Sequence, residues 1–382
     1  MTNHYRVAVI GSTGRGNYGH ALDEAWLEIP ETSIVAVADD NADGLKTASK
    51  RLGVTTLYPD YRVMLQKEKP DIVAICTRWL DQHRDMILAS TAVGAHVYME
   101  KPFCRTLLEA DEIVRSCEQA HVKLCIAHPT RFSPTLETLK QLIGNGVIGD
   151  VLEYRGRGKE DRRGGGEDLW VLGTHVMDMI LALGGQPQWC FATVTEGGVT
   201  VTENHVTEGK EGIGLLAGDT VQSMYGMPDG STAYFASKRH MRGRPSRYGL
   251  QIFGSRGVIE LLEGPLPSVK YLADPSWSPG RSNAHWQNVS SAGIGVPEPL
   301  KAPISSRHYL GIKELIHAIE NDCQPKGSVY DARNATEMIL AIFDSHRMGK
   351  PVSLPLNNRQ HPVSYTHLRA HETDSYIVCR LL

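Results

Sequence analysis

Short apolar runs alternate with amphipathic stretches through the first third of the chain. Runs of strand length occupy residues 6–10, 33–38, 71–76, 96–99 and 123–127. Helical spacing of apolar residues marks the stretches 42–52, 61–67, 85–93 and 106–119, and such alternation is typical of βα units. We therefore predict an α/β domain with a doubly wound parallel sheet over residues 1–128.

After His128 the pattern changes and strands dominate. They are expected at residues 151–158, 189–195, 219–226, 231–237, 248–253 and 258–262, with helices at 309–320 and 332–348. Along residues 151–158, alternation places Glu153, Arg155 and Arg157 on one face. One partly polar face indicates an antiparallel or mixed sheet, so we expect a second α/β domain over residues 129–358.

Length and composition fit a soluble protein of two domains. The 382 residues are too many for one ordinary core. The net charge of −3 gives no reason to expect nucleic acid or an anionic membrane as a partner. The seven cysteines form no CxxC pair, which argues against a disulfide framework, and we expect no metal. With neither a signal-like amino terminus nor a membrane-length apolar segment, the expected location is the cytoplasm.

A glycine-rich turn follows the first strand. It runs from Gly11 to Gly19 and leads into a helix-compatible stretch from His20. Strand, glycine turn and helix together favour a dinucleotide site, with a pyrophosphate at the helix amino terminus. The spacing fits the fingerprint in two registers, and a plain βα turn is the alternative. The candidate cofactor-binding residues of this turn are Gly11, Thr13, Gly14, Arg15, Gly16 and Asn17.

Asp39 closes the second strand, where an acid can bind the ribose hydroxyls of a dinucleotide. The next basic residue is Lys46, so a 2′-phosphate would meet negative charge, and we expect NAD rather than NADP. A solvated turn with a capping carboxylate at Asp40 is the alternative. The loop 77–83 is expected to face the cofactor through Thr77, Trp79 and His83.

Another strand ends abruptly at Glu100-Lys101-Pro102. Pro102 cannot continue a strand ladder and disfavours helical geometry at Lys101. In an open parallel sheet, ligands bind beyond the carboxyl ends of the strands. Lys101 is therefore a candidate catalytic residue that also contacts substrate and cofactor, and Glu100 is a candidate cofactor contact. Alone, the tripeptide is more often a surface turn; its position after a dinucleotide-type domain favours the functional interpretation.

A predicted helix at 171–183 carries His175 and Asp178, which share one face because they are three residues apart. Asp178 is expected to fix the ring tautomer of His175 and to stabilise its protonated form. We interpret His175 as a catalytic base; a hydrogen-bonded core histidine is the alternative.

A charged, glycine-rich loop precedes this helix. Gly164, Gly165 and Gly166 are expected to make it mobile, and Glu167 and Asp168 follow them. A carboxylate at a helix amino terminus is stabilised by the helix dipole, so these two acids are either caps or substrate ligands. The other candidate substrate donors are Arg131, Lys159, Arg162 and Asn17.

These motifs resemble the Gfo/Idh/MocA oxidoreductase family over residues 5 to about 357. The resemblance rests on the turn 11–19, Glu100-Lys101-Pro102, and the segments 131–134, 173–178, 253–257 and 349–351. It implies a Rossmann domain and an α/β domain with a large open, mostly antiparallel sheet through which members often form homo-oligomers. It also implies Lys101 and His175 at the nicotinamide, a cis Lys101-Pro102 bond and carbohydrate-like substrates. One departure is Val171, because many members carry an aspartate four residues before the histidine.

The expected reaction is hydride transfer between NAD and a hydroxyl or keto carbon of a sugar, polyol or glycoside. Lys101 would stabilise the alkoxide, and His175 would take the hydroxyl proton. Two alternatives stay open: a redox-assisted glycosidase that oxidises, eliminates and re-reduces, and a non-catalytic cofactor sensor. Residues 359–382 resemble a translated adaptor or vector remnant, and we exclude them from the fold.

Overall fold

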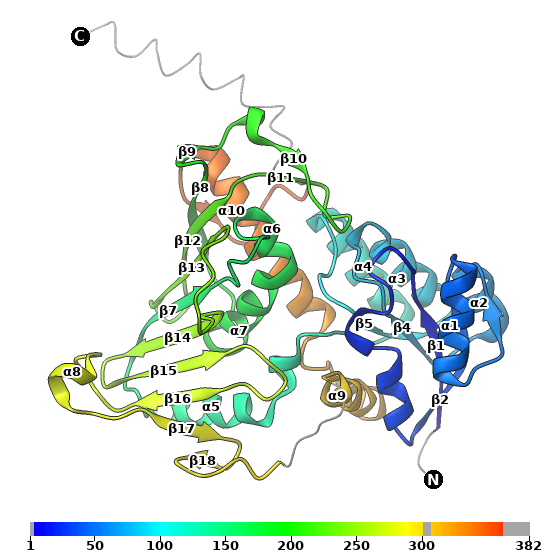
Figure 1. Ribbon diagram of the computed structural model, residues 1–382, viewed down its shortest axis with the longest axis horizontal. Helices are drawn as coiled ribbons and strands as arrows, with labels where there is room; N and C mark the ends of the chain where they lie inside the picture. Colours follow the sequence, from blue (N-terminus) through cyan, green and yellow to red (C-terminus); the bar gives the residue numbers. More distant parts are fainter. Residues whose placement is uncertain (1–3, 301–306, 362–382) are drawn as a thin grey trace, which may run out of the picture.

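The computed structural model describes residues 4–300 and 307–361 (Figure 1). Two α/β parts lie side by side, a parallel sheet from the amino-terminal third and a much larger sheet from the later chain. Most of the expected tail, residues 362–382, lies outside the described residues. Arg359, which we placed in that tail, forms ion pairs with Asp111 and Glu337 and so belongs to the folded chain.

Six parallel strands form the first sheet, in the order β3-β2-β1-β4-β5-β6. They are β1 Tyr5–Ile10, β2 Thr32–Ala38, β3 Leu57–Tyr58, β4 Ile72–Ile75, β5 His96–Met99 and β6 Leu124–Ile126. The helices between β2 and β6 are α1 Ala42–Leu52, α2 Tyr61–Glu68, α3 His83–Ala92 and α4 Leu107–Ala120. The strand order reverses between β1 and β4, the kind of switch point at which such sheets bind ligands. The predicted doubly wound fold is confirmed.

The segment after β1 differs from our prediction. In place of an α-helix it contains two short 3-10 helices, Gly19–Ala21 and Glu24–Glu28. His20 and Ala21 have φ angles of 50° and 59°, left-handed values that a right-handed α-helix does not accommodate. The expectation of a pyrophosphate on an α-helix amino terminus at this point is therefore wrong.

The second sheet has 11 strands, in the order β18-β17-β16-β15-β14-β7-β13-β12-β8-β19, with β9 Val199–Thr200 paired to β8. Its other strands are β7 Val151–Arg157, β8 Trp189–Glu196, β12 Thr220–Gly226, β13 Thr232–Lys238, β14 Gly249–Gly254, β15 Gly257–Leu262, β16 Val269–Leu272, β17 Gln287–Ser290, β18 Gly293–Ile294 and β19 Val352–Ser353. Only the pairing of β7 with β13 is parallel among the described strands of this sheet. The predicted large, mostly antiparallel sheet is confirmed.

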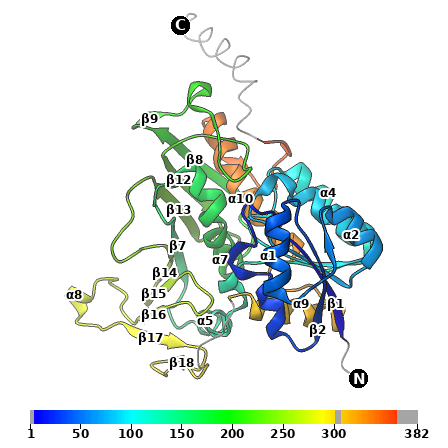
Figure 2. The same ribbon diagram turned by 45° about the vertical axis from the view of Figure 1, so that its right-hand side comes forward.

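One face of this large sheet carries helices. Helices α5 Pro134–Gly144, α7 Thr174–Gly184 and α10 Val329–Met348 lie on the face toward the first domain (Figure 1 and Figure 2). Helix α9 Tyr309–Glu320 instead packs its apolar residues into the core of the first domain. None of the helices in the described part of the chain is long and apolar enough to cross a bilayer.

The opposite face of the large sheet is partly polar, as predicted. Along β7, Arg155 is exposed whereas Tyr154 is buried. Arg157, Gln251 of β14 and Lys270 of β16 line the same groove on this face. The alternation along β7 therefore sends its charged side chains away from the helices and its apolar ones toward them.

The helix predicted at 171–183 is interrupted near its start. A short helix, α6 Gly166–Asp168, continues into a π-helix at Leu169–Gly173, and α7 begins at Thr174. π-Helical turns are rare in proteins as a whole, but those that do occur are often found at functional sites. Val171 lies within this π-helix, directly before the turn that carries His175.

Gly165 and Gly166, at the start of α6, pack closely against the segment 217–219, and the mobility that we expected of this loop stays a prediction. The amide of Gly166 donates a hydrogen bond to the Gly218 carbonyl at 3.0 Å. A Cβ on Gly165 would lie 2.4 Å from the Gly218 oxygen, and one on Gly166 would lie 2.3 Å from the Ala217 oxygen. Glycine is required here because another backbone segment approaches closely.

Candidate active site

Lys101 follows β5 and connects the two domains. Its side chain is only 5% exposed, and its Nζ donates to the backbone carbonyl of Val171 at 2.9 Å. Burial lowers the pKa of Lys101, while Glu100 and Glu211 oppose that shift. The Lys101-Pro102 bond is cis, as the family resemblance implied. The strand end thus delivers a buried ammonium group onto the segment that leads into His175.

Glu100 fixes the start of this turn. Its carboxylate is buried and accepts a hydrogen bond from the Lys101 amide at 3.1 Å. It also faces Nδ1 of His20 at 2.8 Å and Nε2 of His308 at 3.7 Å. Burial opposes ionisation of Glu100, but the hydrogen bond and charge of His20, followed by the charge of His308, lower its pKa to about 2. Glu100 is therefore an anion that anchors the lysine, and its predicted cofactor contact stays a prediction.

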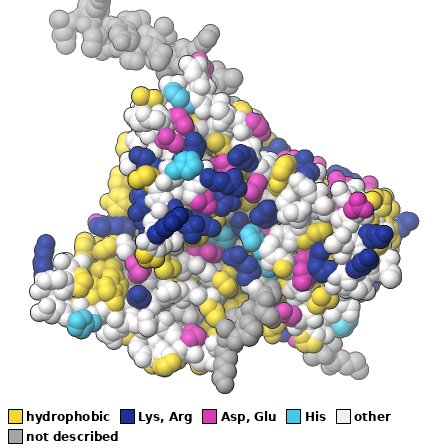
Figure 3. All heavy atoms as spheres, viewed as in Figure 1, with side chains coloured by type: hydrophobic (Ala, Val, Ile, Leu, Met, Phe, Trp, Pro, Cys, Tyr) yellow, Lys and Arg dark blue, Asp and Glu magenta, His cyan; other side chains and the backbone are white. Residues whose placement is uncertain are grey.

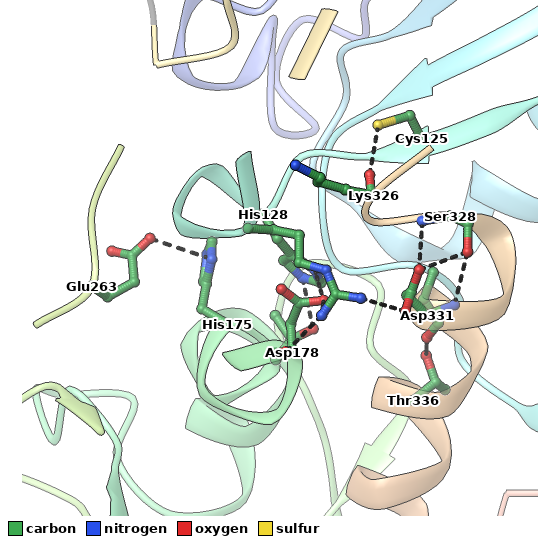
Figure 4. A network of polar contacts seen from close by, with 12 residues as sticks. Cys125, His128, His175, Asp178, Glu263, Lys326, Ser328, Asp331 and Thr336 are labelled. Atoms are coloured by element: carbon green, nitrogen blue, oxygen red, sulfur yellow. Dashed lines mark hydrogen bonds and ion pairs between the residues drawn. The ribbon is translucent and has the colours of Figure 1, made fainter. Parts of the chain in front are cut away.

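His175 lies in the first turn of α7 and is 4% exposed. Burial lowers its pKa well below the usual value, and the charges of His128 and Lys101 act in the same direction. A histidine with a lowered pKa is neutral at physiological pH and keeps a lone pair that accepts a proton. Its Nδ1 faces Oε1 of Glu263 at 3.4 Å (Figure 4).

Asp178 does not orient His175, contrary to our prediction. Its Oδ1 lies 3.5 Å from Nδ1 of His128 and 3.6 Å from Nη1 of Arg131 (Figure 4). Burial raises the pKa of Asp178, but Arg131 and His128 outweigh burial and hold it below the usual value. Residues three apart on a helix are neighbours, yet a buried guanidinium is a stronger partner for a carboxylate than a neutral imidazole.

Arg131 is occupied within the protein. It donates to the backbone carbonyl of Asp178 at 3.1 Å and pairs with the carboxylate of Asp331 on α10. Its side chain is 9% exposed, so it joins α7 to α10 from the inside. This placement contradicts the substrate-donor role that we predicted for Arg131.

Glu263 is a candidate that we did not predict. It directly follows β15 and is largely buried beside His175, with Arg307 at 3.8 Å. An acid immediately after a predicted strand is the same signal that singled out Asp39. The signal was present in the sequence, but no spacing rule links a strand end to a histidine on a distant helix.

The nucleotide side of the site is built around Asp39. Its carboxylate accepts hydrogen bonds from the Thr13 hydroxyl at 2.7 Å and from the Asn41 amide at 3.0 Å. A cavity of about 220 Å³ lies beside it, lined by residues that include Asp39, Asp40 and Tyr61. The Ser12 hydroxyl on the same wall is buried and has no hydrogen-bond partner within the described residues. An acid, an aromatic ring and a spare hydroxyl around one cavity fit the adenosine end of NAD.

In the glycine turn, Gly11 and Gly16 lie close to neighbouring groups, whereas Gly14 faces open space. Gly14 has a φ of 86°, and a Cβ on it would meet nothing within 4 Å. A Cβ on Gly16 would lie 2.6 Å from the Arg78 amide nitrogen, and one on Gly11 would clash with the Tyr18 ring. The turn therefore packs against the loop after β4, while Gly14 leaves room for a phosphate group to approach the backbone.

Other predicted cofactor residues hold this turn in place. Asn17 accepts a hydrogen bond from the Gly14 amide at 2.9 Å through its Oδ1, so it holds the turn, and its predicted role as a substrate donor stays a prediction. Thr77 donates to the Arg15 carbonyl at 2.8 Å, and the Arg15 guanidinium lies 4.5 Å from the centre of the Trp79 ring. Their direct contacts with a cofactor stay predictions.

His83 is not a cofactor contact. It is fully buried, with Nδ1 2.8 Å from the Pro102 carbonyl and Nε2 2.8 Å from the Thr77 carbonyl. It lies at the first position of α3, so its ring points inward between two loops. His83 therefore fixes the loop after β4 to the turn that carries Lys101.

The acids of the glycine loop have different positions. Asp168 is fully buried and accepts hydrogen bonds from the Glu160 amide at 3.2 Å and from the Ser237 hydroxyl. Burial raises its pKa to about 6. This placement contradicts substrate contact by Asp168 and supports a structural role. Glu167 and Lys159 are half-buried and Arg162 is exposed, and their substrate roles stay predictions.

Charged groups gather where the two domains meet. Figure 3 shows Lys and Arg side chains beside acidic and histidine side chains over the middle of this face. Arg307, Lys101, His128 and Lys159 all act electrostatically on Glu263. Such a cationic environment is suited to stabilise a substrate oxygen that gains negative charge during a reaction.

The known proteins to which this chain is similar include dehydrogenases of a sugar and of a polyol. D-apiose dehydrogenase of Paraburkholderia graminis is 25% identical over 358 residues, which cover 89% of this chain and 88% of that protein. Myo-inositol 2-dehydrogenase of Thermotoga maritima is 24% identical over 258 residues, with coverages of 65% and 74%. The structure of levoglucosan dehydrogenase with NADH and levoglucosan has a TM-score of 0.74 at 20% identity and covers 92% of this chain and 100% of that one. That last likeness shows the fold.

Two family models divide the chain between them. Residues 5–128 match the NAD-binding Rossmann fold of the GFO/IDH/MocA oxidoreductase family. Residues 136–260 match the C-terminal domain of the same family. Together they account for most of the described chain, and they follow one another as the two sheets do. The chain therefore belongs to the Gfo/Idh/MocA family of NAD-binding oxidoreductases.

Proposed function

We propose that this protein is an NAD-dependent dehydrogenase that acts on a hydroxyl-bearing carbon of a sugar, polyol or glycoside. The observation that carries the proposal is the 2.9 Å hydrogen bond from Lys101 Nζ to the Val171 carbonyl. It brings an ammonium group of the first domain onto the segment that precedes a buried, neutral His175. The relatives named above are dehydrogenases of a sugar and of a polyol, which supports this substrate class.

Lys101 is proposed to stabilise the substrate oxygen. Its described acceptor is a neutral backbone carbonyl, which accepts a weaker hydrogen bond than an oxygen with alkoxide charge. Exchange of the Val171 carbonyl for the reacting oxygen therefore strengthens the interaction as the charge develops. An interaction that is stronger in the transition state than in the ground state accelerates the reaction.

His175 is proposed to act as general base. Burial and the neighbouring positive charges keep the imidazole neutral, so it is ready to take the hydroxyl proton. Bound NAD would supply the acceptor for the hydride that leaves the same carbon. In the reverse direction, the protonated imidazole returns the proton to the carbonyl oxygen.

Cofactor selection is proposed to lie in the cavity beside Asp39. Three carboxylates, Asp39, Asp40 and Asp60, and one guanidinium, Arg62, belong to its described lining. The excess of negative charge disfavours the 2′-phosphate of NADP, and Asp39 accepts hydrogen bonds that a ribose hydroxyl can supply. This arrangement supports NAD as the cofactor.

The open face of the large sheet is proposed to join copies of the chain into a dimer or tetramer. Its groove contains both signs of charge, from Arg155 and Lys270 and from Glu153 and Glu260, so it is compatible with pairing against a second copy of itself. Light scattering after gel filtration is expected to give a multiple of the chain mass, and a monomer would contradict this part. The cytoplasm stays the proposed location.

The activity is tested with NAD and a panel of sugars, polyols and aryl glycosides. NADH absorbance and released aglycone are followed together. Stoichiometric NADH with at least one compound supports the dehydrogenase. Aglycone release without net NADH would instead favour a redox-assisted glycosidase, and NAD binding with no turnover of any compound would favour a sensor.

A further inference from the structure

We infer that Glu263 is the positioning residue for His175 and fills the role left open by Val171. Glu263 accepts a hydrogen bond from Nδ1 of His175, which leaves the lone pair on Nε2 for the substrate hydroxyl. It also balances the positive charge that the ring gains when it takes the proton. This inference rests on the proposed function, because it assigns Glu263 a role through the base.

The contact joins two buried polar atoms, one on Glu263 and one on His175. Oε1 of Glu263 lies 3.4 Å from Nδ1 of His175, and Figure 4 shows the carboxylate pointing at the ring from a separate segment. Both atoms lack a conventional hydrogen-bond partner within the described residues, and Nη2 of Arg307 lies 3.8 Å from the same Oε1. Because buried polar atoms are nearly always paired in folded proteins, a small shortening of this contact satisfies both.

The segment that carries Glu263 is held on both sides. The Gly264 amide donates to the Thr130 hydroxyl at 3.0 Å, and that hydroxyl lies 2.9 Å from the Gly264 carbonyl. The Glu263 amide faces the Tyr248 carbonyl at 3.5 Å. These contacts fix the backbone of Glu263 against the loop after β6. A carboxylate on a fixed backbone is suited to hold one ring orientation.

The segment that carries His175 is held by the same neighbours. The Tyr248 hydroxyl donates to the Leu172 carbonyl at 2.8 Å, and Lys101 donates to the next carbonyl back, that of Val171. Tyr248 therefore contacts both the backbone of Glu263 and the turn before His175. The segments that carry Glu263 and His175 are therefore held by contacts that share Tyr248.

The other acids near the helix are committed elsewhere. Asp178 faces His128 and Arg131, and Asp168 is bonded to Ser237 inside the loop. Neither has a described contact with His175. Glu263 is therefore the acid that the fold presents to the base, from a position far from the one many family members use.

The charges around His175 explain what Glu263 does. Burial is the largest cause of the lowered pKa of His175, and the charges of His128, Lys101, Arg307 and His20 on the surrounding elements lower it further. Burial raises the pKa of Glu263, and the charges of Arg307 and Lys101 oppose that rise. In its ionised form Glu263 adds negative charge at contact distance from the ring. Removal of that charge destabilises the protonated ring further. In Glu263→Gln the acid limb of the kcat/KM profile therefore moves to lower pH, while the rate on the plateau falls.

The kinetic test compares Glu263→Gln with wild type and with Glu320→Gln, a matched charge change at the exposed end of α9. Loss of the orienting acid is expected to lower kcat/KM about 10- to 100-fold and to move the acid limb down by on the order of one pH unit. Glu320→Gln is expected to change neither. In a His175→Asn background, Glu263→Gln is expected to cost less than about twofold. An unmoved limb, or an undiminished loss in that background, would overturn the inference.

A second readout does not depend on turnover. Nitrogen-15 NMR of labelled histidine identifies His175 by the resonance that disappears in His175→Asn. The wild-type spectrum at neutral pH is expected to show the tautomer protonated on Nδ1, and the Nε2-protonated tautomer would overturn the inference. If no compound is oxidised, the proposed function fails while this spectrum still decides the role of Glu263. Should Glu263→Gln not fold, Glu263→Asp keeps the charge and is expected to retain the tautomer and the position of the acid limb.

Discussion

The ammonium group of Lys101 donates a hydrogen bond to the backbone carbonyl of Val171, across the boundary between the two domains. The lysine ends a strand of the parallel sheet, and the carbonyl belongs to a π-helix of the other domain. The acceptor is the main-chain oxygen of Val171, the position at which the family resemblance led us to look for an aspartate. This contact is the reason for placing the reacting carbon between Lys101 and His175.

Removal of the ammonium group is expected to stop the reaction without loss of the cofactor. Lys101→Met should lower kcat about 10²- to 10³-fold, because the developing alkoxide loses its donor. NAD affinity in calorimetry should stay within about threefold of wild type. The exposed Lys50→Met on α1 serves as control for the loss of one positive charge. Full activity in Lys101→Met would remove the lysine from the mechanism.

Asp39 is expected to decide between the two nicotinamide cofactors. Asp39→Ala removes the acceptor of the Thr13 and Asn41 hydrogen bonds and the negative charge beside the cavity. NAD affinity should fall about tenfold, as for loss of one charged hydrogen bond, and NADP affinity should fall less or rise. Asp43→Ala, an exposed acid in the first turn of α1 outside the described lining of the cavity, is the matched control. Equal losses for both cofactors would show that Asp39 only supports the fold.

Substitutions of the two acids in the glycine loop are expected to have different effects, one on stability and the other on KM. Asp168→Asn weakens the buried contacts with the Glu160 amide and Ser237, so the free energy of unfolding should fall by about 1–3 kcal/mol while KM stays unchanged. Glu167→Gln is expected to raise KM without a change in NAD affinity. Denaturant titration and steady-state kinetics are measured on both variants. A raised KM in Asp168→Asn alone would reverse the assignment.

Stability is expected to fall as the solution becomes acidic. Burial lowers the pKa of His308 from 6.5 to about 4, so the unfolded chain takes up a proton near pH 6.5 while the folded chain does not. The contribution of His308 is therefore complete above about pH 6.5 and is lost as the pH falls toward 4. Between about pH 8 and pH 5 this group alone removes roughly 2 kcal/mol.

Urea titrations at the two pH values measure this loss. His308→Gln should reduce the difference between them, whereas the exposed His285→Gln should leave it as in wild type. His175, whose pKa is also lowered by burial, adds to the wild-type slope in the same direction. An unfolding free energy that does not change between the two pH values would contradict the described burial of these rings.

Much of the fold follows from local pattern. The alternation of apolar runs and amphipathic stretches predicted the parallel sheet, and period-two alternation predicted the polar face that carries Arg155. The glycine turn predicted a dinucleotide site, but not the left-handed His20 and Ala21 that replace the first α-helix. Left-handed backbone at a histidine and an alanine leaves no mark in composition or periodicity, because it is imposed by surrounding packing.

The sequence indicated which residues belong to the candidate site better than it indicated which of them contact one another. The strand end at Lys101 and the histidine on the following domain were visible in the sequence. The pairing of His175 with Asp178 was wrong, because helical spacing says which residues are neighbours and not which cation is buried beside them. Arg131 and His128 reach Asp178 from a loop that is remote in sequence. Glu263 was missed for the same reason, because it is remote in sequence from His175.

The most direct test of the central claim is single-turnover NADH formation by wild type and His175→Asn, both saturated with NAD, across a range of pH. A general base contributes about 10²- to 10⁴-fold, so the variant should be slower by that factor near neutral pH. Its rate should then rise steadily with hydroxide concentration, because solvent base takes over the proton transfer. A variant that binds NAD and forms NADH at the wild-type rate with the wild-type pH profile would contradict the account.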